Sequence, residues 1–465
     1  MTFKKGIMKT RLIILALAVS IISCKKEVLD LEPISEIGSG EFYQTSEDLE
    51  LATIAIYDAL QLIPLREFAL TEMRSDNTRT KSSEGIWAEF ENYTIQPTNQ
   101  QVGDYWTANY NVIFRANKIL ENLDVVTETD LRNQLEGEAK FNRAYAHFNL
   151  VNGYGDVPLV DKVLTIDESG NLDSEYFDRD PVADVMAFII QDLIDASALL
   201  PASSAMDFGR ATSGAAQALL AKVYLTNGEH GLAEGILSAL IASNEYALEA
   251  DYSDVFYSEG NGEIIFAIPY LNDDLFESQD FSFEMTAGGV RSGLNYLTDD
   301  FIANMNPLDT ARGKVLQNPD NAEEVGKFLT SSSNVRLCGN DWIVLRLADV
   351  YLMHTEAIMA GFPATQNIDA ITSYNMVRSR AGLSTIATDG SGEVTLEMLL
   401  DERRYELAFE NHRFYDLVRT GQAQTILTDF ATSEGYIFTS TDLLLPIPQG
   451  EINVSNGLLT QNPGY

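Results

Sequence analysis

Helical periodicity is the feature that most restricts what this chain can fold into. In eight segments apolar residues recur at spacings of three and four, which gathers them on one face of an α-helix. These segments are residues 48–63, 104–123, 131–151, 180–201, 213–244, 345–361, 367–382 and 395–417. They are spread over both halves of the 465-residue chain, so the sequence predicts a mostly α-helical fold built from amphipathic helices.

One of these segments indicates how the helices pair. In residues 213–244, Ala221 and Tyr224 lie on one helix, Gly228 interrupts it, and Ala233 follows where the next helix must pass close by. Small residues at such places let two antiparallel helices approach, as in tetratricopeptide helix pairs. The repeats are irregular, so the pattern alone supports a mostly helical domain that contains helix pairs.

Two long segments interrupt the helical pattern. Residues 71–103 and 245–340 are polar and carry scattered aromatic side chains, and the second contains a short strand candidate at residues 262–270. Loops of this length inside a compact domain are usually functional or disordered. We expect one domain over residues 46–465 with these two segments as its loop-rich part.

The N-terminus has the pattern of a bacterial export signal. Cationic residues precede an apolar run, residues 12–22, that is too short to cross a bilayer core of roughly 30 Å. The run leads to Cys24, and this junction resembles a lipobox, in which the cysteine is acylated. We expect a signal peptide at residues 1–23, with Met8 as a second possible start, and an acylated tether over residues 24–45. The alternative is a secreted protein in which Cys24 has no such role.

Charge and cysteine content exclude some classes of partner. The 69 acidic residues outnumber the 31 Lys and Arg residues, which gives a formal net charge of −38. Such a chain repels phosphate groups, so nucleic acid and anionic lipid surfaces are poor partners. Once Cys24 is acylated, Cys338 has no cysteine to pair with, so we expect no disulfide framework. The 45% of hydrophobic residues must therefore supply a core that holds the fold.

Catalytic signatures are missing from the sequence. It contains no H-E-x-x-H, G-x-S-x-G, P-loop or paired C-x-x-C motif. The four histidines are far apart and mostly lie in helical patterns, which favours structural roles over metal binding: His147, His230, His354 and His412. We therefore expect no enzymatic activity, no cofactor and no metal site.

The most conspicuous charged stretch is "DERRYELAFENHRFYDLVRTG", residues 401–421. Helical spacing allows ion pairs between Arg403 and Glu406, between Glu410 and Arg413, and between Asp416 and Arg413 or Arg419. The stretch could be a clamp for an anion or a sugar. We favour a structural interpretation, in which paired arginines join this helix to its neighbours.

Several motifs together resemble the SusD/RagB family of bacterial surface lipoproteins. The charged stretch is similar to that family's C-terminal signature, and "GEAKFNRAYAHFNLVNGYGDVPLV" is similar to its helix and Tyr-Gly-Asp-x-Pro turn. "GRATSGAAQALLAKVYL" and "LRLADVYLMHTEA" resemble its tetratricopeptide-like helices, and "YNMVRSRAGL" matches its Asn-x-x-Arg-x-Arg-Ala-Gly element. The closing segment "LLLPIPQGEINVSNGLLTQNPGY" is similar nearly throughout. The resemblance covers both ends and most helices of the mature chain.

This resemblance implies a fold, a location and partners. Family members have four tetratricopeptide-like helix pairs on one side and an irregular, loop-rich ligand-binding face with short strands on the other. They sit on the outer membrane through their lipid anchor. They capture a nutrient, often an oligosaccharide or polysaccharide, and deliver it without catalysis to a SusC-like TonB-dependent transporter. The loops vary within such a fold, so no ligand residue can be transferred from the family.

Candidate ligand residues therefore come from the chemistry of the two loop segments. Sugar rings pack on flat aromatic side chains, and their hydroxyl groups pair with planar polar groups. The first segment offers Trp87 and Tyr93, and the second offers Tyr296 with several phenylalanines nearby. Their polar neighbours in the sequence are Arg74, Asp76, Asn77, Arg291 and Asn295. Trp106 and Trp342 fall within or beside helical patterns, so we expect them in the core.

Other functions remain open at this point. A tetratricopeptide-type scaffold lipoprotein would have no small ligand, and its loop aromatics would be dispensable. The ligand could be a peptide instead of a glycan. A glycoside hydrolase would need two carboxylates roughly 5–10 Å apart beside a sugar-binding cleft.

Overall fold

The computed structural model describes residues 42–81, 85–164, 177–285 and 295–465. The predicted signal peptide, Cys24 and most of the tether lie outside these ranges. Within them, every helix is too short or too polar to span a bilayer. Cys338 is a buried free thiol.

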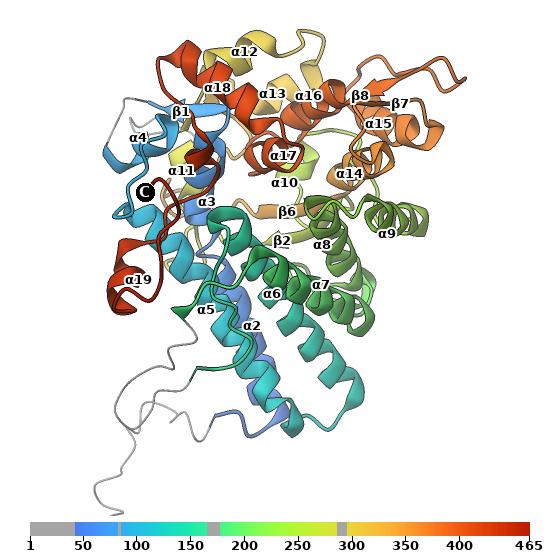
Figure 1. The fold of residues 1–465 in the computed structure, drawn as a ribbon. Helices are drawn as coiled ribbons and strands as arrows, with labels where there is room; N and C mark the ends of the chain where they lie inside the picture. Colours follow the sequence, from blue (N-terminus) through green and yellow to red (C-terminus); the bar gives the residue numbers. More distant parts are fainter. Residues whose placement is uncertain (1–41, 82–84, 165–176, 286–294) are drawn as a thin grey trace, which may run out of the picture.

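Eight helices within the described residues form a continuous series in which each packs against the next. In Figure 1 the series runs from the bottom of the molecule around its right side to the upper right. Its members are α2 (Ser46–Leu60), α5 (Gln100–Asn122), α6 (Thr129–Tyr154), α7 (Val182–Leu199), α8 (Ser213–Thr226), α9 (His230–Ser243), α14 (Leu347–Met359) and α15 (Ile368–Arg380). This arrangement confirms the mostly helical fold and resembles a short solenoid of helix pairs.

The α8–α9 pair shows how local sequence produces this packing. The Thr212 side chain caps α8 by accepting from the Ala215 amide at 3.1 Å. Gly228, with φ +78°, turns the chain after α8 in a conformation that costs glycine little. Ala221 and Ala233 are fully buried, as the close approach of two helices requires. The predicted helix pair is therefore confirmed.

The predicted strand is confirmed and its partner is now visible. β2 (Ile264–Ile268) pairs antiparallel with β6 (Trp342–Arg346), and α14 begins at the next residue, Leu347. The helical pattern that seemed to start at residue 345 thus includes the end of a strand. Both strands are largely buried, which explains why their apolar runs lack the alternation of a half-exposed strand.

The two loop-rich segments fold into short elements, most of which lie at the top and upper left of Figure 1, while β2 and α10 (Asp254–Tyr257) lie near its centre. A four-stranded sheet has the order β1-β3-β5-β4 and joins both segments. Its strands are β1 (Thr78–Thr80), β3 (Asn295–Leu297), β5 (Asn321–Val325) and β4 (Gln317–Asn318). Short helices accompany them: α3 (Pro64–Thr71), η2 (Glu72–Arg74), α4 (Gly85–Glu91), α10 (Asp254–Tyr257), α11 (Phe281–Met285), α12 (Asp299–Asn304) and α13 (Thr310–Leu316).

The charged stretch forms two helices, so the single helix expected over residues 395–417 is wrong. α16 (Leu396–Glu406) ends before α17 (Arg413–Arg419) begins. Between them Phe409 and Asn411 have positive φ angles of 66° and 62°, which a helix does not accommodate. Further C-terminal elements are β7 (Ala364–Thr365) paired with β8 (Val394–Thr395), and α18 (Ala423–Glu434), η6 (Ser440–Leu443) and α19 (Gln449–Val454).

The charges of this stretch are buried and paired with distant segments. Arg346, 1% exposed, donates to Glu410 at 2.7 and 2.8 Å, to Glu406 at 2.6 Å and to Glu263 at 2.8 Å. Arg312 adds a contact to Glu406 at 3.3 Å. Arg346 belongs to β6 and Arg312 to α13, and Glu263, which also binds Arg346, lies directly before β2. The stretch is thus joined to its neighbours by ion pairs, so its structural interpretation is confirmed.

The local pairs expected from helical spacing are mostly wrong. Of the expected pairs only Arg419 with Asp416 is present among the described contacts. Arg403 instead pairs with Asp416 at 2.7 Å and with Asp349 of α14 at 2.8 Å. Arg413 reaches across to the Asp76 carboxylate. A buried guanidinium needs several acceptors, and side chains of one helix alone do not supply them.

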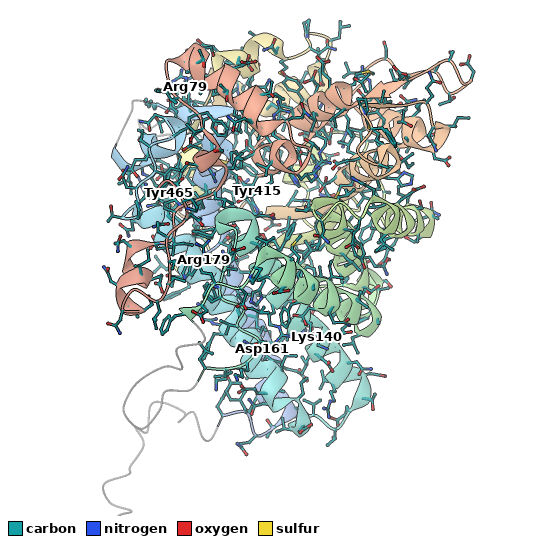
Figure 2. All side chains as sticks on the ribbon, in the orientation of Figure 1. Arg79, Lys140, Asp161, Arg179, Tyr415 and Tyr465 are labelled. Carbon is teal, nitrogen blue, oxygen red and sulfur yellow. The ribbon has the colours of Figure 1, made fainter. Side chains whose placement is uncertain are left out.

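The C-terminal segment is hydrogen-bonded to the end of α6 and, through Arg179, to the turn that follows it. The Asn462 side chain donates to the carbonyl oxygens of Tyr154 and Leu445, at 2.9 and 2.7 Å. Arg179 donates to the Asn462 side chain at 2.5 Å and to the Asp156 carbonyl oxygen at 2.7 Å. Arg179 and the C-terminal Tyr465 can be located in Figure 2, on the same side of the molecule. The Tyr-Gly-Asp turn after α6 is thus held by the end of the chain.

Trp106 and Trp342 are 4% and 2% exposed, which confirms their place in the core. Two of the histidines bond to neighbouring protein groups, although His147 Nε2 is buried without a hydrogen-bond partner within the ranges that the structure describes. His147 approaches the Arg143 carbonyl oxygen at 2.9 Å, and His354 contacts two serine hydroxyls at 2.8 and 2.9 Å. In the described parts of the chain, acidic, histidine and cysteine side chains form no group that could hold a metal ion.

Candidate functional site

The small sheet brings the two loop segments together. β1 pairs antiparallel with β3, in a register that places Arg79 opposite Tyr296 and Thr80 opposite Asn295. The Arg79 guanidinium lies 5.9 Å and the Lys81 ammonium 5.6 Å from the centre of the Tyr296 ring. Figure 2 places Arg79 at the top of the molecule, among the loop-rich elements. We call this side, formed by residues 61–99 and 245–340, the loop face.

The expected polar ligand residues of the first segment lie beneath this face. Arg74 and Asn77 are fully buried and Asp76 is 3% exposed. Asp76 accepts from Arg413 at 2.7 and 2.8 Å and lies 3.4 Å from Arg404. Although burial favours its neutral form, the two arginines hold the pKa of Asp76 well below its usual value. These side chains join the loop face to α16 and α17, and their geometry does not support ligand contact.

The terminal nitrogens of the Arg74 guanidinium are also held by the protein, whereas its Nε is buried without a hydrogen-bond partner among the described residues. Its guanidinium donates to the carbonyl oxygens of Leu70 and Asp442, at 3.1 and 2.5 Å, and lies 4.0 Å from the centre of the Phe414 ring. Tyr93 in turn donates to the Arg74 carbonyl oxygen at 3.1 Å and is 7% exposed. Its ring meets Phe438 edge to face, so Tyr93 is held inside the protein.

The expected residues of the second segment are also covered. Tyr296 is 5% exposed and Asn295 is fully buried, and Arg291 lies outside the described residues. Trp87 differs from them, because on α4 it is only half-buried and stacks on Phe68 with ring centres 5.6 Å apart. Among the aromatic candidates from sequence, Trp87 is the one that the described structure leaves partly open to solvent.

The structure adds an exposed aromatic turn at residues 271–277. Phe276 is 87% exposed and its neighbour Leu275 is 79% exposed. The turn is closed by a hydrogen bond from the Leu271 amide to the Glu277 carbonyl oxygen at 2.7 Å. Inside it, the Asp274 carboxylate accepts from the Phe276 amide at 2.8 Å. The chain thus exposes two large apolar side chains on an ordered turn.

A second set of hydrogen bonds fixes this turn to the protein. Asp273, with φ +60°, accepts from the Ser332 hydroxyl at 2.7 Å, the Ser333 hydroxyl at 2.8 Å and the Asn334 amide at 2.8 Å. These bonds hold the pKa of Asp273 well below its usual value. In the sequence, Phe276 is one of several phenylalanines that precede Tyr296; Phe281 and Phe283, by contrast, are buried. Sequence contains no signal that separates the exposed ring from the buried ones.

Next to the turn, the loop face carries a cation over an aromatic ring. The Arg336 guanidinium lies 4.1 Å from the centre of the Phe283 ring and 3.3 Å from the Glu284 carboxylate. The Arg336 side chain is 56% exposed. Burial and the nearby Asp280 raise the pKa of Glu284 to about 7, and Arg336 partly offsets this. The face therefore combines exposed apolar rings with polar and ionisable groups.

Comparison with known proteins agrees with this architecture. A family described as "Starch-binding associating with outer membrane" matches residues 27–225, and one described as "SusD family" matches residues 324–465. The chain is similar to SusD-like protein P2 of Formosa agariphila, with 24% identity over 98% of this chain and 100% of that protein.

Solved structures extend the comparison to the fold. A laminarin-binding SusD-like protein is 26% identical, covers 91% of this chain and 100% of its own, and superposes with a TM-score of 0.73. Surface glycan-binding protein A from Bacteroides thetaiotaomicron, solved with laminarihexaose, shares the fold with a TM-score of 0.73 at 22% identity, over 90% of this chain and 99% of that one. With matches at both ends of the sequence and a shared fold, the chain belongs to the SusD/RagB family.

Proposed function

We propose that this protein is a cell-surface lipoprotein that captures a glycan on its loop face and passes it to a TonB-dependent outer-membrane transporter. The observation that carries the capture role is the ordered turn that exposes Phe276, with half-buried Trp87 on the same loop face. Exposed flat rings beside polar groups are what a sugar-binding surface requires. Family membership and the laminarin-binding relative support the choice of a glycan.

Members of this family bind glycans without catalysis. The sequence also lacks the protease, lipase, nucleotide-binding and redox motifs named above. The family is associated with the outer membrane, and acylated Cys24 would supply the attachment. The transporter partner rests on the family resemblance.

Binding of polysaccharides to the purified domain, residues 25–465, tests the capture role. Affinity electrophoresis and isothermal titration against laminarin, starch, xylan, mannan and a peptide library would identify the ligand class. For a glycan ligand, Phe276→Ala and Trp87→Ala should each weaken binding about 2- to 10-fold, since an aromatic contact contributes ~0.5–1.5 kcal/mol. Leu232→Ala is a matched control, because Leu232 is 54% exposed on α9.

Each result has a clear meaning. Binding to a glycan that both loop-face variants weaken, in folded protein, would support capture. If the protein binds peptides and no glycan, its ligand is a peptide. If it binds neither class, a scaffold function is favoured. If an outer-membrane transporter co-purifies with the full-length wild type but not with Cys24→Ala, delivery at the membrane is supported. If Cys24→Ala is found in the membrane fraction in the same amount as wild type, Cys24 is not the anchor.

A further inference from the structure

Two hollows lie beside the Tyr257 ring; the smaller one reaches Asn272 at the base of the exposed turn, and neither is lined by Phe276 or Trp87. The larger has a volume of about 620 Å³ and the smaller about 280 Å³. Tyr257 and Leu329 line both of them, so the two hollows share this pair of residues as a common wall. Together they fall within the size range of small-molecule sites in proteins, about 300–1,000 Å³. We call them the Tyr257 groove.

The Tyr257 ring is both exposed and fixed. It closes α10 and is 46% exposed. Its hydroxyl donates to the Gly326 carbonyl oxygen at 2.8 Å and accepts from the Leu329 amide at 3.3 Å. Because the hydroxyl is occupied by the backbone, the surface left to a ligand is mainly ring carbon. A flat apolar face held in one place suits the C–H face of a sugar ring.

The smaller hollow supplies planar polar groups. Asn272, Asn340 and Asp341 line it together with Ser331 and Glu259. The Asn272 amide donates to Ser331 at 3.1 Å, and the Asp341 carboxylate accepts from the Tyr270 amide at 3.1 Å. Burial and the nearby Glu259 raise the pKa of Asp341 to about 6. The Asn272 side chain also accepts from the Gly339 amide at 2.8 Å, and the Asn340 side chain donates to the Leu329 carbonyl oxygen at 3.2 Å. The second donor hydrogen and acceptor lone pair of each amide, together with the Asp341 carboxylate, can pair with hydroxyl groups of a sugar.

The larger hollow is more apolar than the smaller one, and the charged residues that line the two hollows indicate which sugars can bind. Its lining includes Val315 and Pro319, with Lys314 and Asp251 as charged members. Asp251 here and Glu259 and Asp341 in the smaller hollow outnumber the single cation of the linings. Sulfated or uronate sugars would meet this negative charge, so a neutral sugar chain fits better.

We propose that the Tyr257 groove is a second glycan-binding site, specific for a neutral oligosaccharide segment. The inference rests on the proposed capture of a glycan and adds to it a separate contact and a charge preference. A chain held at two places on one protein dissociates more slowly than a chain held at one, because the second contact forms within the complex.

Three variants of the purified protein separate a binding role from a structural one. Tyr257→Phe keeps the flat ring and loses the two backbone contacts, whereas Tyr257→Leu loses the ring as well. Ser331→Trp fills the smaller hollow from its exposed rim. Circular dichroism and thermal unfolding establish that each variant is folded before it is titrated.

The probes are neutral hexasaccharides (laminarihexaose, maltohexaose, cellohexaose and mannohexaose), an alginate hexasaccharide, and the parent polysaccharides. For the neutral ligand that binds, we expect two sites in wild type, and a loss of about 5-fold or more at the second in Tyr257→Leu and Ser331→Trp. Tyr257→Phe should stay near wild type, Phe276→Ala should affect only the first site, and the alginate probe should not occupy the groove.

The outcomes distinguish this inference from the function on which it rests. If wild type binds none of the sugars, glycan capture itself fails. If wild type binds and both Tyr257→Leu and Ser331→Trp match it, capture stands and the groove is not a site. If Tyr257→Phe loses as much as Tyr257→Leu, the ring acts only through its backbone contacts and the inference is overturned. Tighter binding of alginate at the groove would overturn the charge preference.

Discussion

Replacing Arg346 by methionine should destabilise the protein more than any exposed ion-pair substitution. Arg346 joins β6 to the carboxylates of Glu263, Glu406 and Glu410 and also donates to the Glu406 carbonyl oxygen at 2.6 Å. Methionine has a similar length but no hydrogen-bond donor. The three buried carboxylates would then share fewer cations, with Lys327 still 2.7 Å from Glu410.

The expected loss follows from the burial of this network. Removing one partner of a buried ion pair costs about 3–5 kcal/mol, because the other charge stays buried without compensation. Unfolding free energies of single domains are about 5–15 kcal/mol, so the variant should lose roughly a fifth or more of its stability. Arg346→Lys keeps the charge but not the planar fork of donors, and its loss should be intermediate.

The loss should also depend on pH. Burial favours the neutral form of Glu406, but Arg380, Arg346 and Arg312 lower its pKa to about 2. A depressed carboxyl pKa contributes stability that is present above the unfolded value and is lost as pH falls through the folded value. Without Arg346 the pKa of Glu406 should be lowered less. The difference between variant and wild type should therefore be largest above about pH 5 and decrease as pH falls toward 2.

Urea denaturation followed by tryptophan fluorescence, at pH 7 and pH 4, measures both effects. Arg132→Met is the matched control, since Arg132 pairs with Asp124 at 3.0 Å on the surface, with side chains 42% and 95% exposed. It should cost less than about 1 kcal/mol. An Arg346→Met midpoint equal to that of the control, or a loss that grows on acidification, would refute the reasoning.

Three further outcomes are expected. Glu67 is buried, and burial raises its pKa to about 7, so its contribution to stability should fall as pH rises from about 4.5 through 7. In Glu67→Gln, urea midpoints measured between pH 5 and 8 should depend less on pH than in wild type. An unchanged pH dependence would contradict this prediction. Gly137→Ala should destabilise the protein by about 1–3 kcal/mol, because its new Cβ would lie 2.7 Å from Leu200 Cγ. Gly235→Ala on α9 meets no atom within 4 Å and should stabilise by about 0.5–1 kcal/mol, so calorimetry that shows equal effects for the two alanines would contradict the packing argument.

The helices could be predicted from sequence because their signal is local. The spacing of apolar residues that turns one face of α6 or α8 inward lies within a single segment, and the break at Gly228 lies in the same segment as α8. The end of α16 at Glu406, inside the 395–417 pattern, could not be predicted in the same way. Its apolar stripe continues through the break after α16, where the chain takes positive φ angles at Phe409 and Asn411. Those angles position Glu410 for Lys327 and Arg346, which are distant in sequence.

The candidate site was harder to predict for the same reason. Sequence identifies polar and aromatic residues in the loops, but it does not show which of them the rest of the chain covers. Arg74, Asp76 and Asn77 have the side chains that a sugar site requires, yet α16, α17 and η6 supply their partners from more than 300 residues away. Phe276 is exposed because Asp273 binds Ser332 and its neighbours, which is a contact between two loops that no spacing rule predicts.

Binding and stability should therefore be separable in this protein. The charge network that joins the loop face to the helices is buried, whereas Phe276 is 87% exposed and loses little packing on truncation. Exposed positions of this kind usually change stability by less than about 0.5 kcal/mol. Phe276→Ala should consequently unfold at the same urea concentration as wild type, so that any loss of glycan affinity reports contact with the ligand. A large shift in its midpoint would mean that the turn is part of the core and that its role in capture must be rejected.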